Sequence, residues 1–395
     1  MTNKTVMKAE QIFIIHLLAD HLAGRMTSIS TDLDWEEVFR LSRIHQIGGI
    51  VYYQCKGSLP QEMLPVFKQR YELDVFQYVK RSTMFRQIRQ AFIENGISCF
   101  TVKGLSVARY YPVPALRTMG DLDIVIRGED RDNADRLLKD NGFRNTSHID
   151  DREWIYFKDG LEYELHDHLV YEEAVNLPGH KFFFNRFWEY VKDEQLDPGF
   201  HFLFLVMHLR KHFMNSGVGF RQFMDIALMA GKEPGMDWPW IEERLIELDL
   251  WTFARTCSGF IQKWFGIEIP IDPIVPDDVF YEEATELIFA NGIFGFHREE
   301  NRRNRTVNEA RNSRNHLMGM IGHAAREVFP SYRYLCTVKR YGYVVGRPYL
   351  IPVTWIHRFA HVLYRYGRRT DRLPVLFASS DEIAKRDAFL KNWGL

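Results

Sequence analysis

Cysteine is scarce in this sequence, with four residues in 395 and no Cys-x-x-Cys pair. So few thiols exclude a disulfide framework and a cysteine-rich zinc site, and they favour a reducing compartment, so we expect a cytoplasmic protein. Long apolar runs are missing as well, since no window approaches the length of about 18 apolar residues that a membrane-spanning helix needs. The apolar run at residues 12–15 stops at His16 with no clean cleavage site after it, which predicts an amphipathic first helix rather than a signal peptide.

The sequence also lacks an excess of charge of either sign, because 51 Lys and Arg face 52 Asp and Glu, for a net charge of −1. A neutral total gives no support to a protein coated with positive charge for nucleic acid. Hydrophobic residues make up 46% of the chain and charged residues 26%, which excludes a disordered or collagen-like protein and predicts a large core. At about 150 residues per domain, the length predicts two or three domains.

Periodicity changes along the chain and predicts an α+β protein, in which a small mixed sheet is flanked by N- and C-terminal helical regions. Residues 76–96 carry apolar residues, among them Phe76 and Val79, at helical steps and end at Asn95-Gly96, whereas the text that follows is rich in β-forming residues. Asp159-Gly160 separates two alternating runs, which predicts a hairpin. The expected strands are 97–102, 121–126, 154–157 and 161–166, and the expected helices from the core onward are 131–139, 201–213, 220–231 and one capped by Asp237. The predicted regions are 1–95 (helical), 96–175 (α/β core), 176–270 (a helical domain that completes the pocket) and 271–395 (helical, basic and aromatic).

Three acidic residues of the core form the pattern with the clearest chemistry. Asp121 and Asp123 are two apart on one expected strand, so their side chains point to the same face. Carboxylates held side by side repel each other and favour a divalent cation such as Mg²⁺, which prefers oxygen ligands. If the strand of Glu164 pairs beside 121–126, three carboxylates converge, as in-line displacement at phosphorus with two metal ions requires. Glu162, on the same face as Glu164, is the alternative third acid.

Lys103-Gly104 ends one expected strand and opens a helix. Such a turn offers backbone N–H groups and the positive end of a helix to a phosphate, and Lys103 adds a charge.

The residues VKG, YPVPALRTMGDLDIVI and ELH, over roughly 97–170, resemble the bacterial uncharacterised nucleotidyltransferase family of the polymerase-β-type nucleotidyltransferase superfamily. The resemblance implies a polymerase-β-like core that uses Mg²⁺ or Mn²⁺ to transfer a nucleoside monophosphate from an NTP, such as ATP, to an acceptor hydroxyl, with release of pyrophosphate. It implies that Asp121 and Asp123 are catalytic metal ligands and that Glu164 is the third acid, either a ligand or the base. The nucleotide contacts that it implies are Lys103, Gly104, Ser106, Arg117, His166 and Arg221.

Several of these residues have a second interpretation. Arg221 and Asp225, four apart on a helix, are also typical of a helix salt bridge. His166 with His168, or His208 with His212, is also compatible with a zinc site.

Two other functions are compatible with the same sequence. The core is compatible with a catalytically silent nucleotide-binding or regulatory module, and the acceptor of an active enzyme is open among a small molecule, a protein and RNA. Residues 331–370 hold nine aromatic residues, eight basic residues and no Asp or Glu. This composition suits a polyanion such as RNA, a membrane surface, or a helical subdomain with its aromatic side chains packed inward. The basic residues are Arg333, Lys339, Arg340, Arg347, Arg358, Arg365, Arg368 and Arg369.

Overall fold

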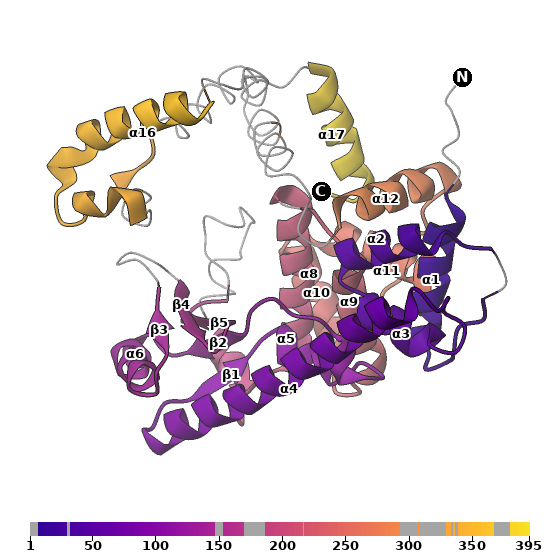
Figure 1. Cartoon of the computed structure of the whole chain (residues 1–395), viewed down its shortest axis with the longest axis horizontal. Helices are drawn as coiled ribbons and strands as arrows, with labels where there is room; N and C mark the ends of the chain where they lie inside the picture. Colours follow the sequence, from indigo (N-terminus) through magenta and orange to yellow (C-terminus); the bar gives the residue numbers. More distant parts are fainter. Residues whose placement is uncertain are drawn as a thin grey trace.

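The computed structural model describes residues 7–29, 32–146, 153–169, 186–215, 217–292, 307, 329–332, 335, 339–366 and 380–395. It has the predicted α+β architecture, in which helices flank one five-stranded mixed sheet (Figure 1). The α-helices are α1 (Ala9–Leu22), α2 (Trp35–His45), α3 (Gly48–Cys55), α4 (Leu64–Glu94), α5 (Gly104–Ala108), α6 (Arg131–Asp140), α8 (Pro198–Asn215), α9 (Phe220–Lys232), α10 (Trp238–Glu247), α11 (Trp251–Phe265), α12 (Asp278–Asn291), α16 (Ile351–Tyr366) and α17 (Ser380–Asn392). Short 3₁₀ segments are η1 (Pro114–Leu116), η2 (Gly128–Asp130), η4 (Phe187–Tyr190), η5 (Lys339–Val344) and η6 (Pro348–Leu350).

The main sheet has the strand order β1-β2-β5-β4-β3. Only the β2–β5 pair is parallel among its pairings, and the other three are antiparallel. The predicted hairpin is confirmed, because Asp159 and Gly160 join β4 to β5 with φ values of 53° and 76°, the left-handed conformation that such a turn requires. The strands are β1 (Cys99–Thr101), β2 (Asp123–Ile126), β3 (Arg144–Asn145), β4 (Glu153–Lys158) and β5 (Leu161–His166), and a separate pair is formed by β6 (Val191–Lys192) and β7 (Gln195–Leu196).

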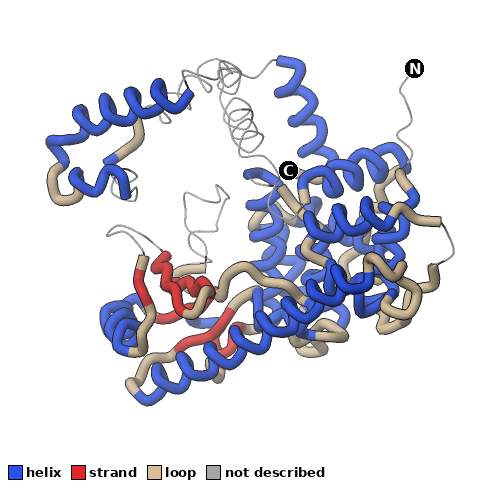
Figure 2. Tube along the Cα trace, viewed as in Figure 1, coloured by secondary structure: helices blue, strands red, loops and turns tan. Residues whose placement is uncertain are grey.

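The long helix α4 runs from the N-terminal helices to the sheet (Figures 1 and 2). Sequence periodicity put Phe76 and Val79 on the apolar side of this helix, which is wrong, since these side chains are 60% and 55% exposed. The buried side instead includes the charged residues Asp74 and Arg81. Asp74 pairs with Arg70 at 2.8 Å, and Arg81 donates to a backbone carbonyl. Because tertiary partners accommodate these charged residues on the buried side of α4, the apolar period of that side is hidden in the sequence.

Alternation along the strands gives the sheet two different faces. Ile124 and Ile126 of β2, with Tyr163 and Leu165 of β5, belong to a buried cluster with side chains of α4 and α6. Because successive side chains of a strand point to opposite faces, the intervening residues of β2 and β5 point away from this cluster. This second face is the one that is turned toward the helices that follow the sheet.

Those later helices form a core rich in aromatic residues. The ring of Trp264 on α11 lies 5.3 Å from Phe220 and 4.9 Å from Phe223, and Trp393, the residue after α17, stacks on Phe260 at 4.4 Å. The expected helices at 201–213 and 220–231 are found within α8 and α9, and the predicted cap is confirmed because Asp237 accepts a hydrogen bond from the Trp240 N–H. Among the described helices, none combines the length and apolar character needed to cross a membrane.

Only part of the basic and aromatic region 331–370 lies within the described residues. Leu335, Tyr341 and Val344 form a small buried cluster, against which residues of η6 and α16 pack. The side chains of Val353, Ile356 and Phe359 on α16 are exposed. Arg333, Arg368 and Arg369, and the side chain of Arg365, lie outside the description, so the three interpretations of this region stay predictions.

The imidazole of His45 makes the fold sensitive to acid. Burial against Phe220 and Phe289 lowers the pKa of His45 from 6.5 to about 4, although the carbonyl of Phe289 acts in the opposite direction. The contribution of His45 to the stability of the fold is therefore complete above pH 6.5. It is lost as the pH falls from 6.5 toward 4, because the unfolded chain takes up the proton first. We expect His45 to account for a loss of about 2 kcal/mol in the free energy of unfolding between pH 7.5 and pH 5.

Urea unfolding at the two pH values tests this expectation. The variant His45→Phe, which fits a site lined by two phenylalanines, is expected to lose about 2 kcal/mol less than the wild type between pH 7.5 and pH 5. His16→Gln, on the exposed side of α1, is the control and is expected to keep the wild-type loss. Equal losses in His45→Phe and wild type would contradict the assignment.

Candidate active site

The carboxylates of Asp123 and Glu164, called the acidic group below, lie on the face of the sheet opposite to α4 and α6. β2 and β5 pair in parallel, with Asp123 opposite Glu164 and Val125 opposite His166. This register brings Asp123, Glu164 and His166 together, since residues two apart share a face. One potential ligand atom from each of the three lies within 4.8 Å of the others. The condition for convergence is thus met for two of the three carboxylates, because the two strands pair and bring Asp123 and Glu164 together.

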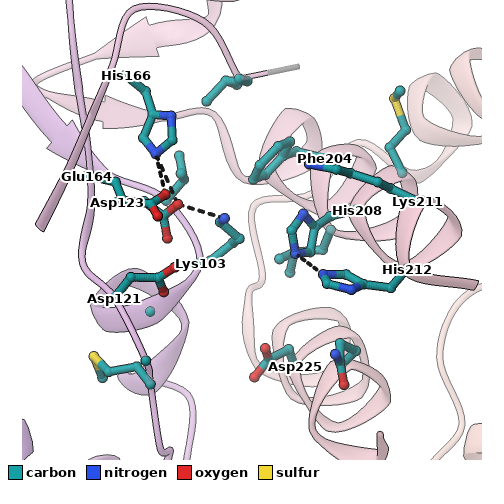
Figure 3. A pocket seen from close by; sticks show the side chains of 18 of the residues that line it. Lys103, Asp121, Asp123, Glu164, His166, Phe204, His208, Lys211, His212 and Asp225 are labelled. Carbon is teal, nitrogen blue, oxygen red and sulfur yellow. Dashed lines mark hydrogen bonds and ion pairs between the residues drawn. The ribbon is translucent and has the colours of Figure 1, made fainter. Parts of the chain in front are cut away.

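Two nitrogen groups balance the buried carboxylate of Asp123. Lys103 Nζ lies 2.7 Å from Asp123 Oδ1, and His166 Nε2 lies 3.2 Å from the same oxygen and 3.3 Å from Glu164 Oε2 (Figure 3). Burial opposes the charge of Asp123, but Lys103 and His166 outweigh it and hold the pKa of Asp123 well below its ordinary value. Burial also opposes protonation of His166, yet Asp123 and Glu164 raise its pKa to about 9. Lys103 and His166 therefore neutralise much of the negative charge that Asp123 and Glu164 bring to the site.

Asp121 lines the same cleft but stands outside this close group. The strand β2 begins at Asp123, later than the expected start at Asp121. The first hydrogen bond between β2 and β5 is the one that the Leu122 carbonyl accepts from the Glu164 N–H at 2.9 Å. Asp121 thus lies in the turn that enters β2. Arg81 of α4 anchors this turn by donating from Nη2 to the Gly120 carbonyl at 2.8 Å. The turn therefore depends on a tertiary contact, whereas Gly120 has no positive φ and leaves room for a Cβ atom.

Lys103 occupies a strained backbone conformation, with φ 54° and ψ −130°. A non-glycine residue at such angles costs about 1–3 kcal/mol, and such strain is common at functional sites. The Lys103 N–H donates to His201 Nε2 at 3.3 Å, and its carbonyl accepts from the Val107 N–H. These contacts fix the backbone so that the ammonium group reaches Asp123.

The turn after β1 has the predicted order of strand, Lys-Gly and helix, but its details differ from the phosphate loop that the sequence suggested. α5 has five residues, too short for a strong helix dipole. Ser106 Oγ donates to the Thr101 carbonyl at 2.5 Å and lies 2.6 Å from Thr101 Oγ1. Ser106 therefore braces the turn, whereas Gly104 is buried and lines the cleft.

The cleft has a volume of about 300 Å³, and its second wall comes from α8 and α9. Figure 3 shows the acidic group on one side and the side chains of α8 on the other, with Lys103 between them. Residues of this second wall include Phe204, His208, Lys211, His212, Arg221 and Asp225. The two walls differ in charge, acidic on the sheet and rich in nitrogen groups on α8.

Arg117 and Asp225 form a buried ion pair at the floor of the cleft. Arg117 donates from Nε to Asp225 Oδ1 at 2.9 Å and from Nη2 to Asp225 Oδ2 at 2.7 Å, and the Tyr111 hydroxyl donates to Oδ1 at 2.7 Å. Asp225 is thus engaged by Arg117 from outside its own helix rather than by Arg221. Arg221 instead donates from Nη1 to the Thr118 carbonyl at 2.7 Å. The helix salt bridge that the sequence spacing suggested gives way to a tertiary network.

The two histidine pairs have different surroundings. His208 Nε2 and His212 Nε2 are 2.9 Å apart across the cleft wall. His166 faces the acidic group, whereas His168 contacts Asp167. The two pairs do not form a common cluster of ligands: the close group that the described residues provide combines His166 with two carboxylates.

Sequence reasoning missed three contributors to the site. Arg81 lies seven residues from both Asp74 and Ile88 on the buried side of α4. This seven-residue spacing is the sequence signal that could have placed Arg81 on that side. Phe204 and Lys211 share a face of α8 with His208, four residues before it and three after it. The sequence showed this helix, but it did not show which side faced the cleft.

Comparison with family models gives one match to the chain. The model of a family described as uncharacterised nucleotidyltransferase matches residues 31–266. The chain belongs to this family. The match runs from just before α2 to just past the end of α11 and so covers both walls of the cleft. Comparisons with curated proteins and with solved structures gave no match. The uncharacterised nucleotidyltransferase family indicates nucleotidyl transfer as the general activity, and an NTP as its substrate.

Proposed function

We propose that the protein transfers a nucleoside monophosphate from an NTP to an acceptor hydroxyl and releases pyrophosphate, with two divalent cations held by Asp121, Asp123 and Glu164. The observation that carries the proposal is the parallel register of β2 and β5, which brings Asp123 and Glu164 together beside Lys103. Membership of the nucleotidyltransferase family supports the reaction class.

The donor set fits a metal ion such as Mg²⁺ or Mn²⁺. Carboxylate oxygens are the ligands that these ions prefer, and an imidazole suits Mn²⁺ as well. His166 Nε2 is buried within ion-pair distance of both carboxylates but has no hydrogen bond of good geometry. A cation shared by Asp123 and Glu164 would add to the neutralisation that Lys103 and His166 provide. When bound, the cations would stabilise the charge that develops at the α-phosphate.

The chain's own residues would position the reactants. The acceptor oxygen forms a bond to the α-phosphorus while the bond from that phosphorus to the β-phosphate oxygen breaks, and the electron pair leaves with pyrophosphate. The proton of the acceptor hydroxyl passes to a carboxylate, for which we propose Glu164 because its side chain is more exposed than that of Asp123. Lys103 and His166 hold the carboxylates in place, and catalysis rests on positioning and electrostatics.

Incubation with Mg²⁺ and each of the four α-labelled NTPs tests the proposal. We expect label to appear in protein, RNA or a small molecule, together with pyrophosphate. A broad screen in which NTP binds, yet no label is transferred, would contradict the proposal and favour a silent nucleotide-binding module.

A further inference from the structure

We propose that the α8 wall of the cleft, formed by His208, Lys211 and His212 with Arg221 of α9, binds the β- and γ-phosphates of the NTP and the departing pyrophosphate. This anion site rests on the proposed function, because it assigns the polyphosphate end of the same substrate.

The carboxylate on this wall, Asp225, is bonded to Arg117 and Tyr111, and within the described part of the chain it forms no ion pair with Lys211 or Arg221. No acidic side chain of the described residues pairs with Lys211, which lines the cleft. Burial lowers the pKa of His212 to about 4 and that of His208 well below 6.5, and in both cases Lys103, Lys211 and Arg221 add to the effect. A polyanion would relieve this positive field, so its binding gains from the same charges that disfavour histidine protonation.

Other groups that the sequence offered for phosphate are already engaged. Lys103 is paired with Asp123, and both Nε and Nη2 of Arg117 are bonded to Asp225. Ser106 is bonded to Thr101. By contrast, the hydrogen bonds that Arg221 makes to described residues all leave from Nη1, and its Nε and Nη2 remain for a ligand.

The wall also lies where the phosphate chain would run. His208 lies four residues after Phe204, and Lys211 and His212 lie three and four residues after His208, so they share one side of α8, and Figure 3 shows this side turned to the cleft. Lys103 Nζ stands between the walls, 2.7 Å from Asp123 Oδ1 and 6.0 Å from the centre of the Phe204 ring. An α-phosphate at the acidic group therefore has its β- and γ-phosphates directed past Lys103 toward His208 and Lys211.

Calorimetric titration with inorganic tripolyphosphate, without divalent metal, tests the anion site directly. Hydrogen bonds to charged groups contribute enough that Lys211→Met and the double variant His208→Gln/His212→Gln should each weaken binding about tenfold or more. Lys211→Arg should restore most of the affinity, because it restores the charge. The matched controls Lys56→Met, at the exposed end of α3, and His16→Gln should bind as the wild type does.

The outcomes separate the two proposals. Tripolyphosphate binding that is absent in the wild type, or unchanged in Lys211→Met and in the double histidine variant, overturns the anion site even if nucleotidyl transfer is observed. If no NTP is a substrate, the proposed function fails, whereas a loss of tripolyphosphate affinity in these variants still supports the site. In an active enzyme, Lys211→Met should raise KM for the NTP about tenfold, which loss of a structural contact alone does not predict. Circular dichroism of each variant verifies that it is folded.

Discussion

Replacing Asp123 with asparagine is expected to lower the rate of nucleotidyl transfer about 10³-fold. Asp123 is the buried member of the acidic group and faces Glu164 in the β2–β5 register. Asparagine keeps the size of the side chain but removes the charge that would bind a cation, and that electrostatic stabilisation contributes several kcal/mol to the transition state. The initial rate of pyrophosphate release at saturating NTP and Mg²⁺ is the measurement.

The chain offers a matched control for the acidic group. Glu162 and Glu164 lie on the same face of β5, but only Glu164 lines the cleft. Glu164→Gln should therefore reduce transfer strongly, whereas Glu162→Gln should leave the rate within about twofold of the wild type, as expected of a residue outside the site. The reverse order would move the third acid to Glu162, and full activity in Asp123→Asn with a native circular dichroism spectrum would remove the metal assignment.

Asp225→Asn is expected to lower the free energy of unfolding by about 3–5 kcal/mol, the largest stability effect that we predict. The substitution leaves Arg117 charged and buried after the loss of two charge-assisted hydrogen bonds. Because Arg117 lies at the floor of the cleft, a shift there also changes the position of Arg221 and the second wall. Urea unfolding at pH 7.5 measures the difference.

An exposed ion pair provides the comparison for Asp225. Arg40 pairs with Glu37 through two hydrogen bonds on the surface of α2. Glu37→Gln should cost less than about 1 kcal/mol, since solvent screens the exposed charges. The double variant Arg117→Leu/Asp225→Leu should recover much of the stability lost in Asp225→Asn, because it leaves no unpaired buried charge. A loss in Asp225→Asn no larger than that in Glu37→Gln would contradict this account of the ion pair.

Local sequence signals were sufficient for much of the α/β core. Asp-Gly between alternating runs specified the hairpin of β4 and β5, since only residues that tolerate positive φ make so short a turn. Alternation along each strand also indicated which side chains point to the same face as Asp123 and which point to the same face as Glu164. The buried side of α4 could not be recognised from the sequence, because Asp74 and Arg81 interrupt its apolar residues and are accommodated by Arg70 and the Gly120 carbonyl.

The sequence by itself determined the α+β class, the Lys-Gly turn and the acidic residues, because strand alternation and turn chemistry act between near neighbours. The tertiary structure alone decided which partner each charge takes. Lys103 pairs with Asp123, Arg117 rather than Arg221 pairs with Asp225, and residues of α8 stand opposite the acidic group. These contacts join segments about 20 to more than 100 residues apart, and spacing along one helix or strand carries no information about such distant pairs.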